Sequence, residues 1–181
     1  MIAVKVICIG KLKEKYLTEA VKEYTKRLSR YCSLNICELE PVRLPDNPSE
    51  NEISTALQKE SEMILKKIPE NSRVFALCIE GKELDSISFS AEIKRASDMG
   101  NSLTFIIGSS YGLSENVKKK ADFKLSVSKM TFPHQLFRVM LLEQIYRGFK
   151  INEGSAYHKW FLIVIMAIIL YNICYRGDWL A

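Results

Sequence analysis

Hydrophobic and polar residues follow two patterns along this chain, one typical of strands and one of helices. Short runs rich in β-branched and aromatic residues predict strands, at residues 2–9, 34–39, 72–79, 103–107 and 123–127. Between these runs, apolar residues recur every three or four positions, which is the spacing of an amphipathic helix. This spacing predicts helices at residues 12–31, 51–68, 88–98, 114–120 and 134–150. Strands that alternate with helices indicate an α/β fold with a mostly parallel sheet flanked by helices.

Glycine, proline and serine mark the expected ends of these elements. Three prolines within residues 41–49 predict a loop, and Glu80-Gly81-Lys82 predicts a turn out of the third strand. Ser114 suits the N-cap of a short helix, and Gly100 the end of the helix before it. Residues 1–159 contain no internal repeat or Ser/Gly linker, so we expect one domain there.

The last 22 residues differ from the rest of the chain. Hydrophobic residues make up 48% of all 181 positions, but 18 of the 22 in residues 160–181. A helix over 160–175 would cover about 24 Å, which is less than the ~30 Å of a bilayer core. We therefore treat residues 160–181 as an apolar extension, with three interpretations open: a reading-frame extension without a selected role, a helix buried on a dimer or partner, or a weak membrane anchor.

Charge and cysteine usage narrow the class of protein. The net charge is +5, and the basic excess lies in residues 1–30 and 118–159, around an acidic middle. Two basic ends can form one positive face for a polyanion, although solvated helix faces explain them equally well. The five cysteines are odd in number and lack C-x-x-C spacing, so neither a disulfide framework nor a zinc site is indicated. With no signal-peptide pattern at the start, we predict a cytoplasmic protein.

Candidate chemistry lies after the third, fourth and fifth strands, because ligands of open α/β sheets bind at the carboxyl ends of strands. The loop at residues 108–112, GSSYG, is neither a dinucleotide fingerprint nor a P-loop, and a plain turn also explains its glycines. In SKMTFPHQ, Thr131 and Pro133 can start a helix that leaves His134 and Gln135 exposed in its first turn. A surface histidine is the simpler alternative.

Three further groups near the C-terminal end carry chemistry. Arg138 and Arg147 are nine residues apart and so not on one narrow helix face, which permits separate partners such as a phosphate and an acidic side chain. Tyr157-His158-Lys159 combines an aromatic ring, a titratable base and a cation. By itself such a triplet is most often an ordinary chain end.

Several blocks in this order resemble a known family. They are CIGKLKEKYL with EYTKRLSRY, LCIEGKEL, FIIGSSYGLS, LSVSKMTFPHQLFRVMLLEQIYRGFKI and the final YHK. The chain from residue 2 to residue 159 resembles the ribosomal RNA large-subunit methyltransferase H family, a single-domain branch of the SPOUT methyltransferases. The resemblance implies a homodimer with a C-terminal trefoil knot. It also implies methyl transfer from S-adenosylmethionine to N3 of a pseudouridine in 23S ribosomal RNA on the assembled ribosome, without a metal.

The resemblance assigns roles to particular residues. Those that would contact S-adenosylmethionine are Leu77, Gly108, Val127, Ser128, Lys129, Met130, Thr131 and Phe132. His158 is the expected general base, and Tyr157 would position the substrate base. His134 and Arg138 would orient the substrate or a phosphate, and the basic residues of 11–30 and 118–120 would contact RNA.

Two departures from the family pattern keep other functions open. Ser109 stands where the family usually has a second glycine, and the chain continues past the Y-H-K end. One alternative is therefore a protein of the same fold that binds S-adenosylmethionine or RNA without turnover. The other is an interaction protein attached to a membrane or hydrophobic partner through residues 160–175.

Overall fold

The strands β1 (Ile2–Ile9), β2 (Cys32–Leu39), β3 (Ser72–Glu83), β4 (Ser102–Ile107) and β5 (Phe123–Ser126) form the sheet at the centre of the protein. Their spatial order is β2-β1-β4-β3-β5, and every neighbouring pair is parallel. This is a computed structural model, and it describes residues 1–155. The sheet confirms the predicted α/β fold with parallel strands.

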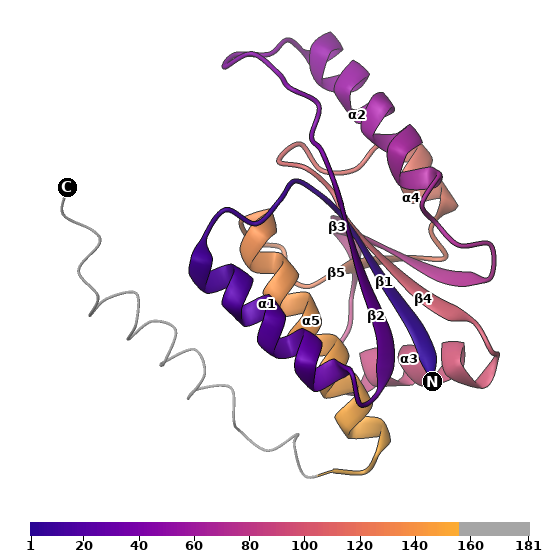
Figure 1. Cartoon of the computed structure of the whole chain (residues 1–181). Coiled ribbons are helices and arrows are strands. Elements are labelled where there is room, and N and C mark those ends of the chain that lie inside the picture. The colour runs from indigo at the N-terminus through magenta and orange to yellow at the C-terminus, as the bar shows by residue number, and fades with distance from the viewer. Residues whose placement is uncertain (156–181) are drawn as a thin grey trace.

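Helices cover both faces of the sheet (Figure 1). On one face lie α1 (Lys15–Leu28), α3 (Ser86–Asp98) and α5 (His134–Asn152), and on the other lie α2 (Glu50–Leu65) and α4 (Glu115–Lys120). Along β1, Val4, Val6 and Cys8 pack on the α5 side, whereas Ile7 and Ile9 pack on the α2 side. Alternate residues of a strand point to opposite faces, so a strand covered on both faces is apolar throughout.

Aromatic rings fill the thicker part of the core, under α3 and α5. Phe75 of β3 and Phe105 of β4 are completely buried and stack with their ring centroids 5.0 Å apart. Phe89 of α3 approaches both rings, at 6.4 and 5.9 Å. These contacts fix α3 on the two middle strands.

The helix boundaries follow their capping residues. Ser114 accepts a hydrogen bond from the Val117 backbone, which confirms the predicted N-cap of α4. Gly100 follows α3 with φ +71°, as expected of a residue that ends a helix. However, α1 begins at Lys15 rather than at residue 12, and Tyr16 is exposed instead of facing the core. The loop before α1 is held instead by Lys13, whose N–H donates to Gln135 Oε1 at 2.8 Å.

The predicted turn at Glu80-Gly81-Lys82 is wrong, because β3 continues through Glu83. The strand contains an irregularity there: Leu125 of β5 pairs with both Leu77 and Lys82. Gly81 serves close approach rather than a turn, since a Cβ at this position would lie 2.7 Å from the carbonyl carbon of Leu125.

Two predictions about the C-terminal part of the chain, the domain boundary and the knot, are not decided by residues 1–155. The boundary between 1–159 and 160–181 lies outside the described part of the chain, and the trefoil knot stays a prediction. Within residues 1–155, no helix has the length and apolar character needed to cross a bilayer.

Candidate functional site

The carboxyl ends of all five strands meet at one edge of the sheet, because the strands are parallel. In the register of β3, Leu77 pairs with Ile107 of β4 on one side and with Leu125 of β5 on the other. Gly108 directly follows β4, and Val127 directly follows β5. The fold therefore brings Leu77, Gly108 and Val127 together, although the sequence separates them by up to 50 positions.

Two positions of the loop after β4 favour glycine, one for lack of space and one for its backbone conformation. A Cβ on Gly108 would lie 2.2 Å from the carbonyl oxygen of Gly112. Gly112 has φ +85°, and its N–H donates to the Ser109 carbonyl oxygen at 2.9 Å. Ser109, the departure from the family pattern, lines a cavity beside α2. The structure therefore accommodates this serine at the wall of that cavity.

The loop after β5 presents apolar side chains to solvent. Val127, Met130 and Phe132 are 40%, 72% and 37% exposed. Ser128 shapes this loop, since its hydroxyl accepts a hydrogen bond from the Met130 backbone at 3.0 Å. An exposed run of large apolar side chains beside two other strand ends is typical of a surface that a ligand or partner covers.

The first turn of α5 follows this loop and is packed more tightly than predicted. His134 and Gln135 are half-buried, not exposed. His134 lies over Gly10 at the end of β1, where a Cβ would come within 3.6 Å of its Nε2. Burial, and then the positive charges of Arg138 and Lys13, hold the pKa of His134 below its usual 6.5.

Arg138 connects the start of α5 to the ends of β1 and β2. Its side chain is 1% exposed, its Nη1 is paired with the carboxylate of Glu38, and its Nη2 donates to the carbonyl oxygen of Gly10 at 2.9 Å. Arg138 and Arg147 do have separate partners in the structure. Each of them pairs with a glutamate, Arg138 with Glu38 and Arg147 with Glu143. In this arrangement Arg138 does not face solvent, so it contributes by holding α5 in place.

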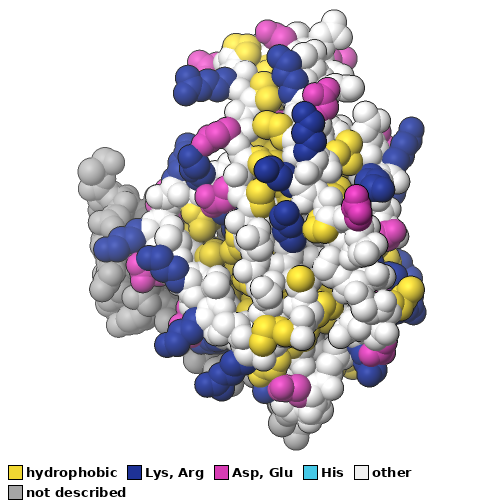
Figure 2. Space-filling model, turned by 45° about the vertical axis from the view of Figure 1, so that its right-hand side comes forward, with side chains coloured by type: hydrophobic (Ala, Val, Ile, Leu, Met, Phe, Trp, Pro, Cys, Tyr) yellow, Lys and Arg dark blue, Asp and Glu magenta, His cyan; other side chains and the backbone are white. Residues whose placement is uncertain are grey.

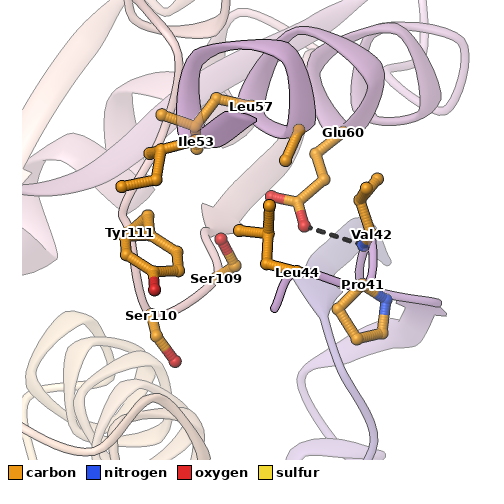
Figure 3. Close-up of a pocket in the computed structure, with 10 residues that line it drawn as sticks. Pro41, Val42, Leu44, Ile53, Leu57, Glu60, Ser109, Ser110 and Tyr111 are labelled. Atoms are coloured by element: carbon orange, nitrogen blue, oxygen red, sulfur yellow. Dashed lines mark hydrogen bonds between the residues drawn. The ribbon is translucent and has the colours of Figure 1, made fainter. Parts of the chain in front are cut away.

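Sequence reasoning missed Glu38 and one more acidic residue near this edge, Glu60 of α2. Glu60 is 4% exposed, and its Oε1 accepts a hydrogen bond from the Val42 backbone at 3.1 Å. It lines the same cavity as Ser109 (Figure 3). Hydrophobic periodicity gives no sign of either role, because a glutamate on a helix or an edge strand is usually solvated.

The remaining candidate groups from the sequence are the Tyr157–His158 pair, the basic surface residues, the cysteines and any metal ligands. Tyr157 and His158 lie outside the described residues. Lysine and arginine side chains are dispersed over the face in Figure 2, with acidic side chains between them. Burial raises the pKa of the Cys8 thiol to about 12, so this thiol is protonated at neutral pH. Residues 1–155 hold no group of three or more metal-binding side chains.

Removing Glu38 is expected to destabilise the fold, because Arg138 would remain buried without its carboxylate. We expect Glu38→Ala to lower the free energy of unfolding by about 3 kcal/mol, as is usual when a buried charge loses its partner. The control is Glu40→Ala. Glu40 pairs with Lys11 on the surface, where both side chains are more than half exposed, so its loss should cost less than about 1 kcal/mol. Urea unfolding measures both, and equal effects would contradict the buried role.

The lowered pKa of His134 predicts a titration midpoint below 6.5 by NMR. Lys13→Met should raise this midpoint, because it removes a nearby positive charge, but burial should keep it below 6.5. The chain has two histidines, so His158→Gln assigns the signals. Since the folded state binds fewer protons than the unfolded state from the lowered pKa up to about 6.5, His134 makes stability rise with pH in that window. A midpoint above 6.5 would refute this environment.

Comparisons with known proteins agree with this arrangement. A family model described as "Predicted SPOUT methyltransferase" matches residues 2–158. "Ribosomal RNA large subunit methyltransferase H 1" of Clostridium perfringens (strain SM101 / Type A) is 55% identical over 157 residues, or 86% of this chain and 99% of that protein. "Ribosomal RNA large subunit methyltransferase H" of Clostridium tetani (strain Massachusetts / E88) is 56% identical with the same coverage. The resemblance inferred from the motifs is thereby confirmed, and the chain belongs to the SPOUT methyltransferase family.

Proposed function

We propose that this protein transfers a methyl group from S-adenosylmethionine to N3 of a pseudouridine in 23S ribosomal RNA, with the assembled ribosome as its substrate. The observation that supports this most is the identity of 55% with a protein named for ribosomal RNA methylation, over 99% of that protein's length. The second support is the shared edge of the sheet, where three strand ends present the loops that the resemblance assigns to the methyl donor.

These loops fit S-adenosylmethionine chemically. The exposed side chains of Val127, Met130 and Phe132 offer apolar surface for an adenine ring and a thioether. Leu77 and the backbone of Gly108, Ser128, Lys129 and Thr131 complete the proposed contacts. Gly108 lets the chain fold back tightly on Gly112 without a side chain in the way. When bound, S-adenosylmethionine supplies an electrophilic methyl group on a positively charged sulfur.

In the proposed reaction, residues of the chain itself remove the N3 proton of the pseudouridine and orient its ring. His158 removes the N3 proton of the pseudouridine, and Tyr157 positions the ring by stacking or hydrogen bonding. His134 is mostly neutral at pH 7, because its pKa is lowered, so it can accept a hydrogen bond from the substrate. Arg138 acts through α5, whose first turn it fixes against Gly10 and Glu38.

We further propose that the protein acts in the cytoplasm as a homodimer. Two exposed apolar residues near this edge, Ile79 of β3 and Met130 of the loop after β5, are 52% and 72% exposed and suit coverage by a second copy. The salt-sensitive RNA contacts would come from basic residues of 11–30 and from Lys118, Lys119 and Lys120.

A methyl-transfer assay tests this function. Ribosomes that lack the methyl group, incubated with the protein and labelled S-adenosylmethionine, should gain one labelled base in 23S RNA. His158→Ala should reduce the rate by about 100-fold or more, which is the usual contribution of a general base. S-adenosylmethionine binding by this variant, measured by calorimetry, serves as the control. Retained binding by the wild-type protein without any transfer would favour the second candidate, a binding protein of the same fold.

The apolar extension generates a separate prediction. Because 18 of its 22 residues are apolar, the full chain should self-associate or bind detergent more than a variant that ends at Lys159. Analytical ultracentrifugation of both forms measures this. Identical, monodisperse sedimentation would exclude contact with a membrane or hydrophobic partner through residues 160–175 and would favour an extension without a role.

A further inference from the structure

The cavity beside α2 contains a buried carboxylate with one oxygen free. Its volume is about 120 Å³, and its walls come from α2, from residues 41–44 after β2, and from residues 109–111 after β4. Val42 donates to Oε1 of Glu60, but among the described residues no donor reaches Oε2. Figure 3 shows the Glu60 carboxylate directed from α2 toward Leu44 and Ser109. A carboxylate oxygen that faces a cavity from an otherwise buried residue favours a ligand with a hydrogen-bond donor.

The other walls specify the body of that ligand. Leu44, Ile53 and Leu57 are apolar, the ring of Tyr111 stands at one side, and Ser109 and Ser110 add hydroxyl groups. Apolar walls, one aromatic ring and a few polar groups suit a flat heterocycle. A closed cavity of roughly 150 Å³ takes up a benzene ring; this one is smaller but opens to solvent, so it can admit the edge of a heterocycle while the rest stays outside.

The position of the cavity relates it to the proposed reaction. Ser109 directly follows Gly108, which is among the proposed contacts of the methyl donor, so the cavity and the donor site share one loop. An enzyme that modifies a base takes that base out of its stack and into a pocket. We propose, on the basis of the proposed function, that this cavity receives the target pseudouridine and that Glu60 Oε2 accepts the hydrogen bond of its N1–H.

The chemistry of the base selects N1–H as the donor. Pseudouridine has two ring N–H groups, and the one at N3 loses its proton to become the methyl acceptor. Only N1–H then remains as a ring donor for Glu60. Uridine lacks this donor, because its N1 carries the ribose. Glu60 is thus a specificity-determining residue: uridine in the cavity would displace water from Oε2 without offering it a donor, which disfavours the wrong substrate.

The test compares ribosomes that carry pseudouridine or uridine at the target position. Glu60→Gln keeps the shape of the side chain and can keep an oxygen toward Val42 N–H, but it turns an NH₂ group toward the base. We expect kcat/KM on pseudouridine to fall by about 10- to 100-fold, the loss of one hydrogen bond to a charged group. On uridine, kcat/KM should stay unchanged. Glu62→Gln, at an exposed position two residues further along α2, should behave as wild type on both substrates.

Calorimetry of S-adenosylmethionine binding distinguishes the remaining outcomes. Unchanged affinity in Glu60→Gln supports contact with the base and shows that the variant is folded. A parallel loss of this affinity would overturn the proposal and assign Glu60 to the ammonium group of the methyl donor. An equal loss of kcat/KM on both ribosomes would also overturn it. If the wild-type protein binds S-adenosylmethionine but methylates neither ribosome, the proposed function fails, and the assignment of the base fails with it.

Discussion

The parallel alignment of five strands is the constraint on which the site depends. Parallel strands need a crossover after each one, and here the helices of these crossovers bury both faces of the sheet. Because no strand runs the other way, every carboxyl end opens on the same edge. Through the register of Leu77 with Ile107 and Leu125, β3 lies between the ends of β4 and β5, whose loops become its neighbours. The site is thus a consequence of strand direction, and its loops are free to vary in chemistry.

A charge network around the buried Arg138 then fixes the start of α5 at this edge. Burying the guanidinium of Arg138 is unfavourable unless its N–H groups find acceptors. The Glu38 carboxylate accepts from Nη1, and the Gly10 carbonyl oxygen accepts from Nη2. These partners come from β2 and β1, whereas Arg138 belongs to α5. The network therefore makes the position of His134, one turn earlier on α5, depend on strands more than 90 residues away in the sequence. Its main effect is on geometry rather than on net stability.

Much of this architecture could be predicted from local patterns, and the exceptions share one physical cause. The strand runs and the Ser114 cap depend on near neighbours in the sequence, so periodicity and capping rules find them. The extension of β3 through Gly81 depends instead on how closely β5 approaches. The burial of Glu60 and Arg138, and the pairing of Arg138 with Glu38, likewise depend on partners that folding brings together. Family motifs located the strand-end loops, but no motif marked Glu60, since its free oxygen matters only in the cavity that three separate segments build.

If the cavity beside α2 receives the target base as proposed, its carboxylate has an electrostatic consequence beyond the hydrogen bond. The negative charge of Glu60 repels phosphates, and the low polarity around it weakens screening by salt. The edge of a neutral base with an N–H group can enter this cavity, whereas the backbone is directed to basic residues outside it. In the proposed reaction, the carboxylate also disfavours a second negative charge on the base. Deprotonation of N3 is therefore easiest when a base such as His158 takes the proton as the positive methyl donor approaches, so that the charge on the ring never develops fully.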